Sequence, residues 1–165
     1  MYGGVDLAAK VENETGVCVL DSDRINSIRT VFEDESIIHL VKGCSVIAVD
    51  APLTDTRKPF REAERELMSE FGGMLPLNTS GMKKLCERAV MLKGVLESET
   101  DGIVIETYPR AVEKAMDVEE EEIDFESGHE YDAYLCALTA KNYDEGRYER
   151  YGKSGETIVI PSREK

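Results

Sequence analysis

The chain has 165 residues, of which 41% are hydrophobic and 33% are charged. This length is typical of one domain, and the composition excludes both a disordered chain and a fibrous repeat. Because 34 acidic residues outnumber 20 basic ones, the net charge of −14 repels phosphate backbones and argues against sequence-independent coating of nucleic acid. We therefore expect one globular domain over residues 1–165, in which any contact with nucleic acid is local.

The sequence also carries signals about location. No apolar stretch reaches the roughly 18 residues that span a bilayer, and residues 1–6 lack the basic and apolar regions of a signal peptide. The four cysteines are far apart and form no C-x-x-C pair, which disfavours a disulfide framework or a structural zinc site. These features predict a cytoplasmic protein with reduced, mostly buried thiols and no membrane contact, and they leave its oligomeric state open.

The first third of the chain predicts a meander followed by a parallel strand. Apolar runs at 3–9 and 17–20 flank a turn-rich segment and predict a β-hairpin, and 24–32 returns as a third strand. A short helix is expected over 34–42, with Asp34 as its cap. The almost wholly apolar segment 45–50 then predicts a strand buried on both faces, which the right-handed crossover rule places parallel to the first strand.

The rest of the chain predicts helices and a further parallel strand, in the following order: helices at 60–71 and 82–97, a fifth strand at 102–107, a short helix at 110–116, an acidic solvated segment at 119–122, a last helix that starts at the capping-box pair Ser127 and Glu130, and an edge strand at 158–161. This order predicts an α/β fold of ribonuclease H-like topology. Its mixed five-stranded sheet would have the order 3-2-1-4-5, flanked by helices, with a helical insertion at about 54–100 between strands 4 and 5.

Four carboxylates stand where a folded core disfavours charge. Asp6 interrupts the first strand, Asp50 ends the fourth, Glu106 ends the fifth, and Asp132 lies in the first turns of the last helix. An unpaired buried carboxylate is costly, and ligands of open α/β sheets gather at the carboxyl ends of strands, so we expect these acids to converge on a cation. Taken singly, Asp50 also fits a turn and Asp132 a first-turn residue.

The chemistry of these ligands indicates the ion and the reaction. Hard oxygen ligands favour Mg²⁺ or Mn²⁺ over zinc, and a pair of such ions promotes phosphodiester hydrolysis. Basic residues follow the fourth strand, and we expect Arg57, Lys58 and Arg61 to bind the phosphates of a substrate. The alternative is that Arg61 and Arg65 pair with neighbouring glutamates on an exposed helix face.

Five segments taken in chain order resemble the signatures of an uncharacterised family, domain of unknown function 429. They are GVDLA at 4–8, IAVDAPL at 47–53, R-x-x-E at 61–64, IETYP at 105–109 and YDAY at 131–134. The resemblance covers nearly the whole chain and implies a ribonuclease H-like fold with predicted nuclease activity.

The resemblance also implies an acidic metal site at Asp6, Asp50 and Asp132, with Glu106 nearby. His129 looks like the paired acid or histidine on the last helix of resolvase-type members, which implies a metal-ligating role. Familiar ribonuclease H enzymes carry an acid on the first long helix, whereas this chain has none after Glu35. Either Glu106 supplies that ligand or the second metal binds weakly.

The sequence therefore favours a nuclease that hydrolyses phosphodiester bonds in nucleic acid through two Mg²⁺ or Mn²⁺ ions. Asp6, Asp50, Asp132 and Glu106 would be the catalytic and metal-binding residues. Two alternatives stay open: a non-catalytic binding or regulatory module on the same fold, and a phosphate-ester binder of the actin and sugar-kinase superfamily. Leu7 and Ala8 disfavour the latter, because such binders need glycine and hydroxyl residues after the first-strand acid to cradle phosphate.

Overall fold

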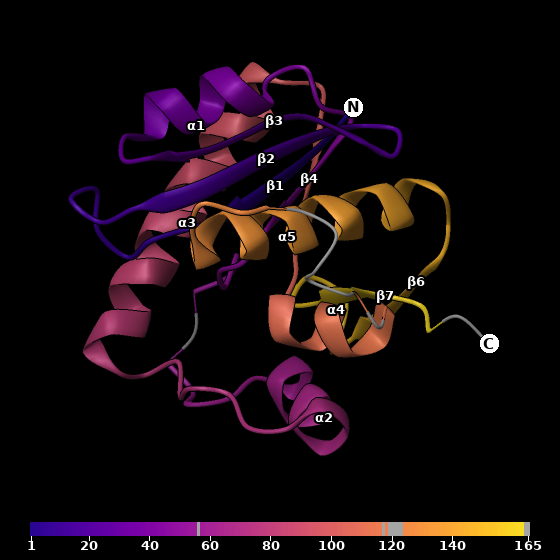
Figure 1. Cartoon of the computed structure of the whole chain (residues 1–165). Coiled ribbons are helices and arrows are strands. Elements are labelled where there is room, and N and C mark those ends of the chain that lie inside the picture. The colour runs from indigo at the N-terminus through magenta and orange to yellow at the C-terminus, as the bar shows by residue number, and fades with distance from the viewer. Residues whose placement is uncertain (56, 117, 119–123, 164–165) are drawn as a thin grey trace.

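A mixed β-sheet forms the centre of the molecule (Figure 1). The computed structural model describes residues 1–55, 57–116, 118 and 124–163. Within them the strands are β1 (Tyr2–Asp6), β2 (Thr15–Asp21), β3 (Arg24–Val31), β4 (Val46–Val49), β5 (Ile103–Glu106), β6 (Tyr148–Tyr151) and β7 (Ile158–Pro161). Their order is β3-β2-β1-β4-β5-β7-β6. β1 pairs antiparallel with β2 and parallel with β4, which in turn pairs parallel with β5. The predicted order 3-2-1-4-5 is confirmed.

The C-terminal strands extend the sheet beyond the five that the sequence predicts. β7 was expected at the edge, but it pairs with β5 at the register Glu106–Ile158 and with β6 on its other side. β6 is therefore the edge strand, and it forms an antiparallel hairpin with β7. The hairpin connection contains Gly152 and Gly155, both at positive φ, a backbone conformation that glycine adopts without steric cost.

The helices cover both faces of the sheet. They are α1 (Asp34–Val41), α2 (Glu62–Phe71), α3 (Ser80–Glu99), α4 (Pro109–Met116) and α5 (Gly128–Asp144). α1 and α3 pack against one face, where Ile37 and Leu96 meet the β4 residue Ile47. α5 packs against the opposite face through Cys136 and Ala140. α2 and α3 lie between β4 and β5 in the chain, so the predicted helical insertion is confirmed (Figure 1).

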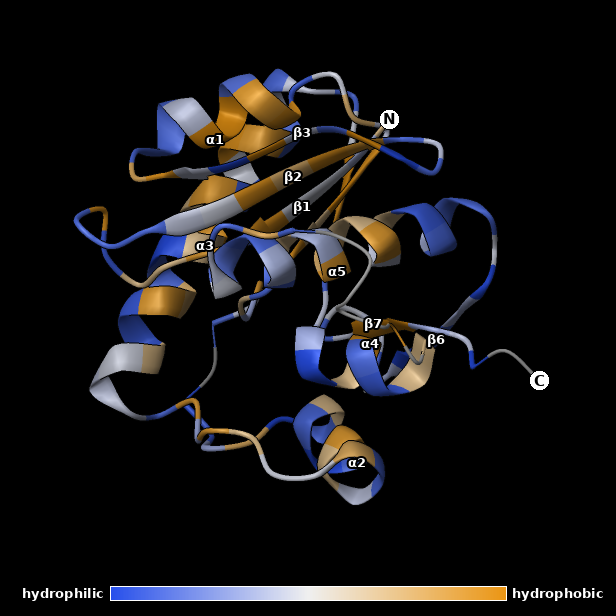
Figure 2. Cartoon of the chain, in the orientation of Figure 1, coloured by the Kyte–Doolittle hydropathy of each residue, from blue (hydrophilic) through white to orange (hydrophobic). Residues whose placement is uncertain are grey.

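The alternation of side chains along β4 explains why its sequence is apolar throughout. Ile47 and Val49 belong to the core beneath α1 and α3, whereas Val46 and Ala48 belong to the core beneath α5. A strand covered on both faces has no side that favours polar residues. Hydrophobic residues accordingly mark the central sheet, whereas α2 carries much hydrophilic surface (Figure 2).

Two glycines let α5 lie very close to the sheet. A Cβ on Gly4 would stand 2.0 Å from the carbonyl oxygen of Ala133, and one on Gly16 would stand 1.9 Å from the carbonyl oxygen of His129. No side chain fits at either place. This close approach brings the first turns of α5, which include Asp132, to the end of β1.

The predicted helix starts are confirmed in part. The Ser127 hydroxyl accepts a hydrogen bond from the backbone N–H of Glu130 at 3.2 Å, as a capping box requires. The Glu130 carboxylate, however, accepts from the N–H of Glu126 instead of closing the box. The prediction that Asp34 caps α1 was wrong: Glu33 holds the cap position, and the Asp34 carboxylate accepts from Arg88 on α3.

Three further sequence predictions concern cysteines, membranes and the acidic segment. All four cysteines are buried free thiols, as predicted. None of the helices in the part of the chain that the structure describes is long and apolar enough to cross a membrane. The acidic segment 119–122 lies outside the described residues.

Candidate active site

Asp6 and Asp50 lie side by side at the carboxyl ends of β1 and β4. The two strands are parallel, with Val5 opposite Val49, and the backbone N–H of Asp50 donates to the carbonyl oxygen of Val5 at 2.8 Å. Both acids line one groove of about 260 Å³. The register of two parallel strands thus places together two carboxylates that are 44 residues apart in the chain, as the sequence predicts.

The electrostatics of Asp50 connect all four predicted acids. Burial raises the pKa of Asp50 well above its usual value, and the negative charges of Asp6, Asp132 and Glu106 raise it further. The same surroundings act on Cys136, one turn along α5 from Asp132: burial and the charges of Asp50, Asp6 and Asp132 raise the pKa of its thiol. The structure therefore brings Asp132 from α5 into electrostatic range of the acids on the sheet.

His129 contacts Asp6 directly. Its Nδ1 atom lies 2.7 Å from Oδ2 of Asp6, and the imidazole side chain is 49% exposed, whereas that of Asp6 is 15% exposed. Burial raises the pKa of Asp6, and the hydrogen bond and charge of His129 oppose this rise without cancelling it. The predicted neighbourhood of His129 and the acids is present, and the imidazole offers Asp6 a partner at the solvent-facing side.

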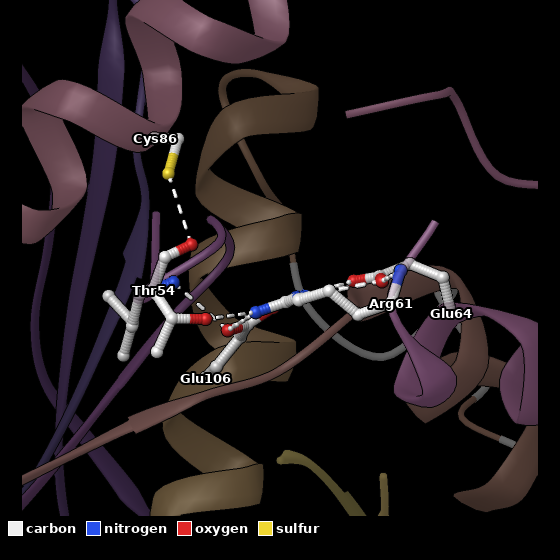
Figure 3. A network of polar contacts seen from close by, with 6 residues as sticks. Thr54, Arg61, Glu64, Cys86 and Glu106 are labelled. Atoms are coloured by element: carbon white, nitrogen blue, oxygen red, sulfur yellow. Dashed lines mark hydrogen bonds and ion pairs between the residues drawn. The ribbon is translucent and has the colours of Figure 1, made fainter. Parts of the chain in front are cut away.

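Glu106 occupies a different environment from the other acids. Its carboxylate accepts from the guanidinium of Arg61 and, at 2.9 Å, from the backbone N–H of Leu53. The same guanidinium pairs with Glu64 and donates to Thr54 at 2.8 Å (Figure 3). Burial raises the pKa of Glu106, although Arg61 and the Leu53 N–H oppose the rise. Glu106 is thus near the other acids but already neutralised in part by a cation of this chain.

The predicted phosphate-binding residues are distributed differently from the expectation. Arg61 is only 2% exposed and forms an ion pair with Glu64 at spacing i,i+3. The alternative prediction, that Arg61 pairs with a neighbouring glutamate, therefore has the right partner. The pair is buried, however, whereas that prediction placed it on an exposed helix face. This position favours a structural role for Arg61, which ties α2 to the end of β5. Arg57 and Lys58 are exposed in the loop after β4 and stand outside the residues that line the groove.

Sequence reasoning missed the apolar part of the groove. Besides the acids, its lining includes five aliphatic or thioether side chains: Met74, Leu75, Leu77, Met82 and Leu85. They come from the connection between α2 and α3 and from the first turns of α3. Within the described residues, no three His, Cys, Asp or Glu side chains are arranged as a preformed metal site.

The strand order, together with acids at the carboxyl ends of β1 and β4, defines a ribonuclease H-like fold. Two solved structures of RuvC from Thermus thermophilus share it. RuvC in complex with a Holliday junction substrate superposes with a TM-score of 0.55 at 13% identity, over 94% of this chain and 97% of that one. A second RuvC structure gives a TM-score of 0.52 at 14% identity, over 87% and 95%. At this identity the likeness establishes the fold.

Comparison of sequences adds no closer relative. The chain matches no protein-family model, so the resemblance to domain of unknown function 429 is not supported by a family match. The solved structures support the ribonuclease H-like fold that this resemblance implies. No curated protein matches it either.

Proposed function

We propose that this protein hydrolyses phosphodiester bonds in nucleic acid with divalent metal ions held at Asp6, Asp50 and Asp132. The observation that carries the proposal is that Asp6 and Asp50 lie side by side at the carboxyl ends of two parallel strands and line one groove. Burial and the charges of Asp6, Asp132 and Glu106 also raise the pKa of Asp50, and a bound cation would compensate these gathered carboxylates. The likeness in fold to RuvC, whose structure contains a Holliday junction substrate, agrees with nucleic acid as the substrate.

The donor set fits Mg²⁺ or Mn²⁺. The proposed ligands are carboxylate oxygens from three elements, β1, β4 and α5, and hard oxygen donors suit these ions. Bound there, the ions would lower the pKa of a water molecule and stabilise the leaving oxygen of a phosphodiester. His129 adds a nitrogen donor close to the set, through its contact with Asp6.

The fold of the chain holds the three proposed metal ligands in position. The paired strands hold Asp6 and Asp50, and the glycine-mediated contact with α5 holds Asp132. The Nδ1 atom of His129 contacts Oδ2 of Asp6 at 2.7 Å and holds that carboxyl group at the solvent-facing side of the site. Glu106 is proposed to assist from the carboxyl end of β5, where Arg61 pairs with its carboxylate. Arg57 and Lys58 are proposed to contact the phosphates that flank the scissile bond.

The test is cleavage of labelled oligonucleotides by the purified chain. Single-stranded, duplex and four-way-junction DNA and RNA are incubated with MnCl₂ or MgCl₂, and products are resolved on denaturing gels. We expect metal-dependent cleavage that EDTA stops and that Asp50→Asn abolishes. Asp101→Asn is the matched control, because Asp101 is exposed ahead of the amino end of β5, away from the site. Cleavage that persists in Asp50→Asn would contradict the proposal.

A further inference from the structure

The groove that contains Asp6 and Asp50 has an apolar half that the proposed hydrolysis leaves unused. Met74, Leu75 and Met82 line it together with the acids. Leu75 is 72% exposed, so its side chain is accessible to a ligand in the groove. The connection that carries it is held in place, because the backbone N–H of Leu77 donates to the carbonyl oxygen of Pro59 at 2.7 Å. The apolar half is therefore a built surface beside the acids.

The described side chains that line this groove offer no positive charge to a phosphate group. Among the described residues that line it there is no lysine or arginine, and Arg61 nearby is occupied by Glu64 and Glu106. A protein of net charge −14 also gains little from long-range attraction to a phosphate backbone. Within the groove, and in the absence of metal, the affinity for a nucleic-acid strand must therefore come from contacts with groups other than phosphates.

Size and chemistry point to a nucleobase. At about 260 Å³ the groove is slightly smaller than the roughly 300–1,000 Å³ of sites that hold drug-sized ligands, so it suits one flat ring system and excludes a base pair within a duplex. Methionine side chains adapt to flat, polarizable surfaces, and Tyr108 adds an aromatic ring to the lining. Apolar and aromatic contacts of this kind bind the faces of bases with little regard to their identity.

We infer that the groove binds one unpaired nucleobase next to the scissile phosphate, and that the substrates of this protein are therefore single strands or unpaired positions in structured nucleic acid. The inference rests on the proposed function for the position of the phosphate at the acids. A fully paired duplex would first have to unstack and unpair a base, which is costly. Discrimination between strands thus arises from the apolar half of the groove, with Leu75 as its most exposed contact.

The experiment compares two single-stranded oligonucleotides that differ in one group. One carries a 2-aminopurine base at a central position, and the other has an abasic sugar there, so their phosphates are identical. Fluorescence anisotropy of an end label gives Kd in metal-free buffer, and gels with MnCl₂ give kcat/KM. We expect the wild type to prefer the base-bearing strand at least about fivefold, the equivalent of about 1 kcal/mol for one stacked base, and to quench the 2-aminopurine.

Two variants test whether the preference for the base-bearing strand depends on the groove. Leu75→Ser should remove most of the preference and leave the abasic strand unchanged. Met91→Ser is the matched control, because Met91 on α3 is equally exposed, at 73%, but lies outside the groove, and it should keep the preference. Equal behaviour of the two strands with the wild type would overturn the inference even if both strands are cleaved, in which case the proposed hydrolysis would survive.

The remaining outcomes separate this inference from the proposed function. Base-dependent binding that Leu75→Ser abolishes, without cleavage of any strand, would support the groove as a base site and reject the nuclease. If the groove instead holds a second copy of the chain, Leu75→Ser would change the sedimentation coefficient and the two strands would bind alike. That result would also overturn the inference.

Discussion

Replacing Arg61 with alanine removes the cation that lies between two buried carboxylates. Arg61, Glu64 and Glu106 are 2%, 1% and 6% exposed, so water cannot readily solvate the glutamates that remain. Removing one partner of a buried ion pair costs about 3–5 kcal/mol, a large part of the roughly 5–15 kcal/mol by which a domain is stable. We therefore expect Arg61→Ala to lower the free energy of unfolding by about 3–5 kcal/mol at pH 7.

The loss should depend on pH with a defined sign. Burial already raises the pKa of Glu106, and Arg61 opposes that rise, so in Arg61→Ala the pKa of Glu106 moves further up. A carboxyl group with a raised pKa in the folded state contributes stability at low pH, which is lost as the pH rises through that value. The deficit of the variant should therefore shrink as the pH is lowered from 7 and Glu106 takes up a proton.

Urea unfolding followed by circular dichroism measures these free energies. Lys93→Ala is the control, because Lys93 and Glu97 form a pair at 3.7 Å in which Lys93 is partly exposed and Glu97 is exposed, and such surface pairs contribute about 0–1 kcal/mol. The triple variant Arg61→Met, Glu64→Gln, Glu106→Gln removes all three charges and should recover much of the loss. If Arg61→Ala costs no more than Lys93→Ala, the buried pairs of Arg61 with Glu64 and Glu106 do not stabilise the fold.

Three further predictions concern the acids and the helix that carries Asp132. In metal-free buffer Asp50→Asn should raise Tm at pH 7–8, since burial and neighbouring acids raise the pKa of Asp50, and the gain should fade as the pH is lowered and the carboxyl takes up a proton. A lower Tm at pH 7 would contradict this. Gly4→Ala should cost about 1–3 kcal/mol or more, because its methyl would stand 2.0 Å from a carbonyl oxygen of α5, whereas Gly94→Ala, which meets nothing within 4 Å, should be neutral or stabilising in thermal unfolding. His129→Ala should raise the pKa of Asp6, measured by carboxyl ¹³C titration, because burial then acts without the opposing imidazole; an unchanged titration would show that the contact at 2.7 Å has no electrostatic effect.

The sheet was predictable because its signals are local and repeated. The apolar run of β4 is explained by burial on both faces, and the crossover rule then fixes its neighbour. β6 was missed because its sequence alternates weakly: Glu149 and Arg150 are consecutive and both exposed. Its hairpin with β7 depends on positive-φ glycines and on the open edge of β5, which are tertiary features that a strand pattern does not report.

The positions of the candidate site residues were predictable where the direction of the strands alone determines them. Asp6 and Asp50 end neighbouring parallel strands, so their proximity follows from topology. Asp132 was expected to converge with them, and the close approach of α5 to Gly4 and Gly16 is what allows this. The burial of Arg61 was not predictable, because it depends on how the loop after β4 folds back over β5 and Glu106. The apolar half of the groove was likewise hidden, since Met74 and Leu75 belong to a connection whose position only the fold defines.

Titration of the metal-free protein with MnCl₂ in an isothermal calorimeter tests cation binding at Asp6, Asp50 and Asp132, because it detects the ion without requiring a substrate. We expect the wild type to bind Mn²⁺ and Asp50→Asn to weaken the affinity at least about tenfold, or about 1.4 kcal/mol, whereas Asp101→Asn should leave it unchanged. A wild type that takes up no Mn²⁺ or Mg²⁺, or an Asp50→Asn variant that binds as tightly as the wild type, would contradict this expectation.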